Sequence, residues 1–131
     1  MFDTIKTIEL QSKIVRCFAE AVFEKWDYLL VNFEREDTAG EPVEDCLAVV
    51  FTKDGASWKR SSIQAPLACL DSLVELANAM AKDQKGSWAS CTLELEANGK
   101  YRFSFSYGPP RRLNGDFSDD ALFKHFVPRP L

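Results

Sequence analysis

The chain has 131 residues, of which 46% are hydrophobic and 27% charged, and these values predict one globular domain, residues 1–131, with an ordinary hydrophobic core. They exclude a disordered tail and a small scaffold that depends on disulfides. Because the apolar runs are short and the amino-terminal residues mix acidic and basic side chains, we expect no signal peptide and no membrane-spanning segment.

The formal net charge of −4 conceals an uneven distribution along the chain. Residues 1–99 carry 10 Lys and Arg against 17 Asp and Glu, a net charge of −7, whereas residues 100–131 carry 6 against 3, a net charge of +3. The densest acidic stretch is "EREDTAGEPVED", Glu34–Asp45, with six carboxylates and one arginine. Such a segment repels nucleic acid and attracts basic protein surfaces.

The first predicted element is an amphipathic helix from Thr4 to about Lys25. Its apolar residues recur on neighbouring turns and form one broad face. Trp26 marks the transition to "DYLLVNFE", Asp27–Glu34, in which residues alternate between two faces. We interpret this stretch as a β-strand with one face fully buried.

The acidic stretch that follows contains Gly40 and Pro42 and is predicted to be a solvated loop. The next segment, "CLAVVFTKDG" at Cys46–Gly55, is apolar on both faces until its end and predicts a central strand. Ser57–Ile63 is predicted to be its hairpin partner. A second amphipathic helix, from Pro66 to Gly86, has its apolar residues on one stripe.

The last two strands form a hairpin whose register follows from their period of two. Opposed residues lie on the same face of a sheet, which excludes a two-residue turn and requires the three-residue turn Ala97-Asn98-Gly99 with Gly99 left-handed. The register pairs Leu95 with Tyr101, Leu93 with Phe103 and Cys91 with Phe105, and on the other face Glu96 with Lys100 and Glu94 with Arg102. We expect the aromatic residues of this hairpin, including Tyr107, to be buried.

A short helix is predicted after the hairpin, in "FSDDALFKHF", with Ser118 as its N-cap. The order of elements predicts an α+β fold, a mainly antiparallel sheet of four to five strands with two main helices packed on it and a short C-terminal helix.

No residue pattern indicates catalysis, and we expect a protein that is not an enzyme and holds no metal or cofactor. The four cysteines, Cys17, Cys46, Cys69 and Cys91, are widely spaced and are predicted to be free thiols in a reducing cytoplasm. The single histidine, His125, is predicted to be a surface residue at a helix end. The glycines show no phosphate-binding spacing.

The pair Arg111-Arg112 behind an aromatic strand leaves a second hypothesis open. Exposed rings with arginines are typical of single-stranded nucleic-acid platforms. The chain is acidic, however, and its rings share a face with leucines, so no nucleic acid is expected as a partner. We expect these arginines to form salt bridges at the edge of the sheet or to contact a protein.

The segment from Trp88 to Tyr107, "WASCTLELEANGKYRFSFSY", carries a family resemblance. A tryptophan, alternating leucines, Gly99-Lys100-Tyr101 and then alternating aromatics resemble the YezG-like immunity proteins of bacterial polymorphic toxin systems. The chain differs from that pattern after the strand, where Gly108-Pro109-Pro110-Arg111-Arg112 follows.

The resemblance implies a small cytoplasmic immunity protein that binds and neutralises a cognate toxin domain, a basic nuclease being the expected type, by stoichiometric binding. The alternative is a nucleic-acid or regulatory ligand-binding domain that uses the C-terminal hairpin and the two arginines. The oligomeric state is open. The candidate toxin-binding residues are Glu34, Glu36, Asp37, Glu41, Glu44, Asp45, Arg111, Arg112 and Asp116.

Overall fold

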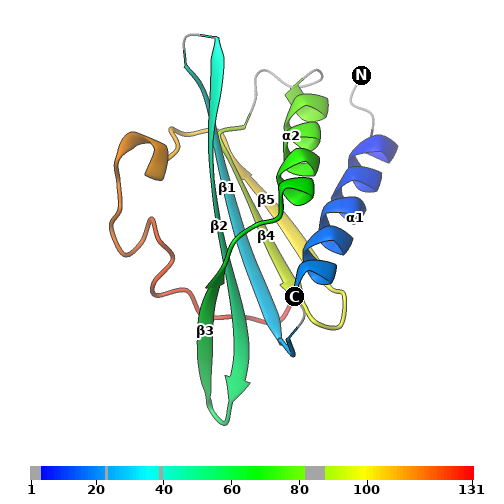
Figure 1. The fold of residues 1–131 in the computed structure, drawn as a ribbon, viewed down its shortest axis with the longest axis vertical. Coiled ribbons are helices and arrows are strands. Elements are labelled where there is room, and N and C mark those ends of the chain that lie inside the picture. The colour runs from blue at the N-terminus through cyan, green and yellow to red at the C-terminus, as the bar shows by residue number, and fades with distance from the viewer. Residues whose placement is uncertain (1–3, 23, 39, 82–87) are drawn as a thin grey trace.

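A computed structural model describes residues 4–22, 24–38, 40–81 and 88–131 (Figure 1). Its five strands form one antiparallel sheet in the order β3-β2-β1-β4-β5. This confirms the predicted α+β fold with two main helices. The elements are α1 (Thr4–Ala21), β1 (Tyr28–Thr38), β2 (Glu41–Asp54), β3 (Ser57–Ile63), α2 (Leu67–Ala81), β4 (Ser90–Glu96), β5 (Tyr101–Ser106) and a 3-10 turn at Arg112–Asn114.

Both helices cover the same side of the sheet, which we call the helix face (Figure 1). Period-two alternation in the strands places one set of apolar side chains on this face, where the apolar stripes of α1 and α2 bury them. Phe18 of α1, Leu73 of α2 and Phe33 of β1 are all fully buried in this core, and the Phe33 ring lies 6.1 Å from that of Trp88.

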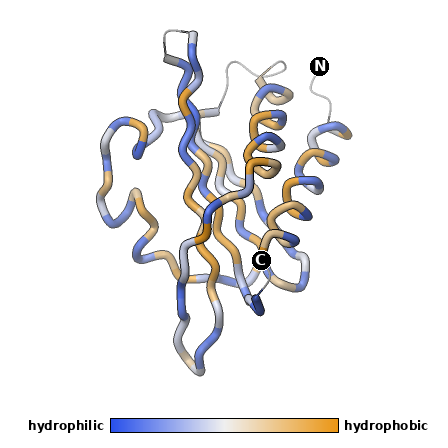
Figure 2. Tube along the Cα trace, viewed as in Figure 1, coloured by the Kyte–Doolittle hydropathy of each residue, from blue (hydrophilic) through white to orange (hydrophobic). Residues whose placement is uncertain are grey.

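The opposite side, the back face, is covered in part by residues 107–131, which we call the C-terminal strap. Phe126 of the strap packs on Tyr28 and Phe51, with ring centroids 6.0 and 5.7 Å apart. Figure 2 shows hydrophobic residues along the middle of the strands and hydrophilic residues at the tips of the hairpins. The sheet therefore has a core on each side, a large one under the helices and a smaller one under the strap.

The register of the β4–β5 hairpin is the one that the sequence predicts. Leu95 pairs with Tyr101, and Gly99 has a φ of +97°. The N–H of Glu96 donates to the carbonyl oxygen of Lys100 at 2.8 Å. The three-residue turn and the left-handed glycine are thus confirmed.

The predicted burial of the hairpin aromatics is wrong in part. Phe103 and Phe105 are half-buried on the helix face, but Tyr101 is 38% and Tyr107 57% exposed. The reason is that β5 is an edge strand, so no further strand of the described chain flanks these rings.

The predicted acidic loop is also wrong, because it is part of a hairpin. β1 continues to Thr38 and β2 begins at Glu41, and the two strands are paired without a break from Tyr28 and Phe51 to Thr38 and Glu41. Gly40, with a φ of +83°, lies at the turn. The segment is rich in Glu and Asp, which are uncommon in strands. It is a strand nevertheless, because its backbone N–H and C=O groups bond to those of the adjacent strand.

The predicted C-terminal helix is a single turn. Ser118 Oγ accepts the N–H of Ala121 at 3.3 Å, as an N-cap does, but Phe123 has a φ of +56°, which ends the turn. At the other end of the chain, α1 ends at Ala21 rather than near Lys25. The predicted end of the second helix at Gly86 lies outside the described residues.

Candidate functional site

The β1–β2 hairpin extends beyond the rest of the sheet. Pairing between β1 and β4 stops at Glu34, with one further bond from the N–H of Arg35 to the carbonyl oxygen of Ala89 at 2.9 Å. Pairing between β1 and β2 goes on to Thr38 and Glu41. Residues 35–38 and 40–44 therefore form a two-stranded ribbon, the acidic arm, which rises past the ends of the other strands (Figure 1).

The acidic arm carries an excess of negative charge on an exposed element. It holds four carboxylates against one arginine, a net charge of −3. Arg35 Nε lies 3.9 Å from Glu44 Oε2, and Arg35 Nη1 donates to Asn78 Oδ1 of α2 at 2.9 Å, which fixes the base of the arm. The four carboxylates are the exposed Asp37, Glu41 and Glu44 and the half-buried Glu36.

Three of the predicted site residues are brought together below the arm, on the back face. Arg112 Nε donates to Asp45 Oδ2 at 2.6 Å, and Arg112 Nη1 lies 3.4 Å from Glu34 Oε2. The guanidinium also donates to the side-chain oxygen of Asn32 at 2.8 Å, to its carbonyl oxygen at 3.0 Å, and to that of Ala121 at 3.3 Å. The side chains of Arg112 and Glu34 are only 3% and 4% exposed.

This buried cluster fastens the strap to the sheet. Glu34 Oε1 also accepts the N–H of Leu113 at 3.0 Å, so one carboxylate binds both the arginine and the backbone beside it. A buried charge is tolerated where it is paired and hydrogen-bonded. Glu34 and Arg112 are therefore engaged within the molecule, whereas the Asp45 side chain is 47% exposed and keeps one face toward solvent.

The remaining two predicted residues form a separate surface cluster. Arg111 Nε donates to Asp116 Oδ2 at 2.8 Å, and Arg111 Nη1 pairs with Asp120. Hydrogen bonds from the N–H and hydroxyl of Ser118, and then from Arg111, lower the pKa of Asp116 to about 2. The expectation that both arginines form salt bridges is confirmed, but the expected place at the sheet edge is wrong for Arg112, which pairs with Glu34 of the central strand β1 and with Asp45 of β2.

A second polar cluster, centred on the buried Glu94 at the far end of the strap, is not indicated by the sequence. Tyr28 OH donates to Glu94 Oε1 at 2.8 Å, and Arg129 donates to both oxygens of Glu94 at 3.2 Å. Burial alone raises the pKa of Glu94, but the hydrogen bonds from Arg129 and Tyr28 outweigh it and hold that pKa below its ordinary value. Burial, followed by the bond to Glu94, raises the pKa of Tyr28.

Two hollows on the back face flank the strap. The first, of about 510 Å³, is next to the base of the arm and is lined in part by Glu34, Thr92, Arg111 and Phe126. The second, of about 590 Å³, lies beside the second polar cluster and is lined in part by Trp58. The surface near the arm is thus concave as well as charged.

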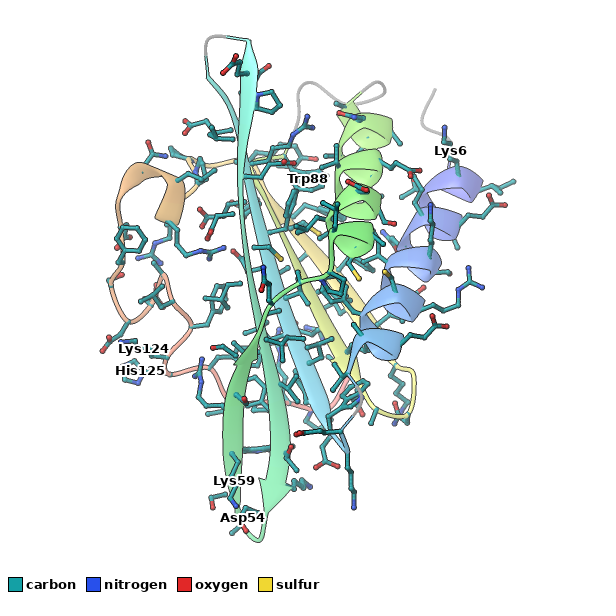
Figure 3. The ribbon with its side chains drawn as sticks, in the orientation of Figure 1. Lys6, Asp54, Lys59, Trp88, Lys124 and His125 are labelled. Carbon is teal, nitrogen blue, oxygen red and sulfur yellow. The ribbon has the colours of Figure 1, made fainter. Side chains whose placement is uncertain are left out.

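The sulfur and imidazole groups are placed away from the arm or inside the core. All four cysteines are free, and burial raises the pKa of the Cys46 thiol to about 12. His125 is 82% exposed and lies 3.4 Å from Asp119, on the outer side of the strap (Figure 3). Within the described parts of the chain, no group of three or more His, Cys, Asp or Glu side chains could hold a metal ion.

None of the helices that the structure describes is both long and apolar enough to cross a membrane. A scan against protein-family models finds no match for this chain. A search of curated proteins finds no similar sequence.

Proposed function

We propose that the chain is an immunity protein, an antitoxin that acts in the cytoplasm by binding one cognate toxin domain with a basic surface, of the nuclease type. The activity is stoichiometric binding, without catalysis and without a cofactor. The family resemblance of Trp88–Tyr107 and the charge of the acidic arm support this proposal together.

The acidic arm is the observation that carries the proposal. Its net charge of −3 is concentrated on a ribbon of two strands that extends past the body of the sheet. Uncompensated surface charge steers a partner of opposite charge and raises its association rate. Val43, 43% exposed at the same place, gives the ribbon an apolar contact between its carboxylates.

The internal ion pairs narrow the set of contact residues. Glu34 and Arg112 are buried against each other, so a partner cannot reach them without breaking the cluster. Arg111 and Asp116 neutralise one another on the surface. The proposed contact residues are therefore Glu36, Asp37, Glu41 and Glu44, with the exposed side of Asp45 at the base of the arm.

The nucleic-acid alternative has less support because its two components are on opposite sides of the sheet. The rings of Phe103 and Phe105 belong to the helix face, whereas Arg112 is buried on the back face. A single-strand platform needs stacking rings and phosphate-binding cations on one surface. Arg111 is also occupied by Asp116 and Asp120.

Co-expression with the toxin domain encoded immediately upstream tests the proposal. We expect host cells to survive a toxin that otherwise kills them, and we expect the two proteins to co-purify in equal amounts. A catalytically dead toxin domain serves as the control for binding without selection. Failure both to bind and to protect would overturn the proposal.

A further inference from the structure

The outer edge of β5 offers unpaired backbone groups. Lys100 and Ser106 both direct their carbonyl oxygens to the β4 side, at 2.8 Å from the N–H of Glu96 and 2.7 Å from that of Ala89. In an antiparallel ladder the bonding direction alternates from residue to residue. The N–H and C=O groups of Tyr101, Phe103 and Phe105 therefore point away from β4, and no strand of the described chain pairs with them.

The same three residues form an aromatic row along that edge. The rings of Tyr101 and Phe103 are 5.8 Å apart, and those of Phe103 and Phe105 are 6.3 Å apart and nearly parallel. Tyr107 follows β5 directly and is 57% exposed. Exposed apolar edges pair with other strands unless charges, prolines or bulges prevent it, and β5 contains neither proline nor any charge on this face.

The other edge of the sheet is protected. β3 carries Lys59 and Arg60 at its centre, and pairing with a second β3 would bring these like charges together. The guanidinium of Arg60 also donates to the carbonyl oxygens of Phe123 and Lys124, at 2.8 and 3.1 Å, so the strap contributes to this edge. Among the residues that the structure describes, the β5 edge has no pairing strand and no facing like charges, whereas the β3 edge has both the like charges and the contact with the strap.

We infer that β5 pairs antiparallel with β5 of a second copy of this chain, about a two-fold axis at Ser104, to form a homodimer. Residues that share a face must pair, and this register places Phe103 opposite Phe105 of the second copy and Tyr101 opposite Tyr107. Tyr101, Phe103 and Phe105 direct their backbone groups outward, so hydrogen bonds form between Phe103 of one copy and Phe105 of the other.

The charges along the β5 edge are compatible with pairing to a second copy of the chain. The only charged residue of β5 is Arg102, which this register places opposite the hydroxyl of Ser106 in the second copy. No like charges therefore meet, although each chain has a net charge of −4. The acidic arm belongs to β1 and β2 and is separated from the β5 edge by β4, so the dimer does not depend on the proposed function.

Sedimentation over a range of protein concentrations tests the interface with a matched pair of variants. Ser104→Lys places two lysines opposite each other at the axis, on an exposed position that does not alter the core. Ser62→Lys adds the same charge to the exposed edge strand β3. We expect a dimer for the natural chain and for Ser62→Lys, and a dissociation constant at least about tenfold higher for Ser104→Lys. A natural chain that stays monomeric, or an unchanged Ser104→Lys dimer, would overturn the inference.

Oxidative cross-linking tests the register itself. Directly opposed residues of a non-hydrogen-bonded antiparallel pair have Cα atoms roughly 4.5 Å apart, which suits a disulfide. We expect Ser104→Cys to yield a covalent dimer under mild oxidation, and Ser62→Cys to yield no more than the natural chain with its own four cysteines. Equal cross-linking of the two variants contradicts the register.

Discussion

Arg112 and Glu34 form an ion pair between the strap and the central strand, with 3.4 Å between Nη1 and Oε2 and both side chains almost fully buried. Removal of one member of such a pair leaves the other charged, buried and without its partner. We therefore expect Arg112→Met to lower the free energy of unfolding by about 3–5 kcal/mol. Urea denaturation measures this change.

Arg111→Met is the matched control for that variant, because Arg111 is adjacent in sequence and its ion pairs are exposed to solvent. Exposed pairs contribute little to stability. We expect the control to unfold at nearly the same urea concentration as the natural chain. Equal destabilisation by the two substitutions would show that the buried cluster does not hold the strap.

Glu94 makes the second cluster sensitive to pH. Because its pKa in the folded state lies below the ordinary value of about 4.3, its stabilising contribution is complete above that pH and is lost as the pH falls through the lowered pKa. We expect Arg129→Met to be less stable than the natural chain at pH 7. The difference between the two should shrink as the pH falls below about 4.3.

Arg102→Met provides the comparison for this pH series. Arg102 lies on β5 at the position paired with Glu94 of β4, and it lowers the pKa of Glu94 through its charge, without a hydrogen bond to the carboxylate. Its loss should change the pH dependence of unfolding less than the loss of Arg129 does. A stability difference for Arg129→Met that stays constant from pH 7 to acid would contradict the role given to Glu94.

The turn of the β4–β5 hairpin depends on the left-handed backbone conformation of Gly99. Gly99 has a φ of +97°, a region in which a side chain is strained, so Gly99→Ala should cost about 1–2 kcal/mol of unfolding free energy. Gly108→Ala is the control, because an added Cβ there meets only Ser106 Oγ, at 3.8 Å. Thermal or urea unfolding should leave the control within about 0.5 kcal/mol of the natural chain. An equal loss of unfolding free energy in the two variants would show that the positive φ of Gly99 does not determine the cost.

The sequence predicts those parts of the fold whose signal is local. Period-two alternation around Leu93 and Phe103 determines which face each residue occupies, and the parity of that pattern determines the turn. The apolar stripes of the two helices likewise identify most of their buried residues, although Ile8 and Leu67 of these stripes are 52% and 73% exposed. These elements are confirmed, with α1 ending at Ala21 rather than near Lys25; the predicted end of the second helix lies outside the described residues.

The parts that the sequence does not predict depend on distant partners. Glu34–Asp45 reads as a loop because its composition is charged, and only its pairing between two strands reveals the arm. Nothing in the spacing of Arg112 or Arg129 indicates which carboxylate each one reaches across the sheet. The predicted burial of Tyr101 is wrong for the same reason. Alternation shows which face of the sheet a residue occupies, but it does not show whether its strand lies at an edge.

In the proposed function the acidic arm recruits a basic toxin domain, and the rate of association with that domain is the measurement that depends on the arm alone. Reversal of Glu36, Asp37, Glu41 and Glu44 to lysine changes the charge of the arm without touching the buried cluster. The control reverses four exposed carboxylates elsewhere, Glu9, Glu20, Glu24 and Asp71, and has the same net charge.

Stopped-flow mixing with the toxin domain at low and high salt compares the two variants, and urea unfolding confirms that both are folded. We expect association of the arm variant to be at least about tenfold slower than that of the natural chain at low salt, with the gap narrowing at high salt, while the control loses much less. An arm variant that associates as fast as the natural chain, or a control that is slowed equally, would contradict the claim.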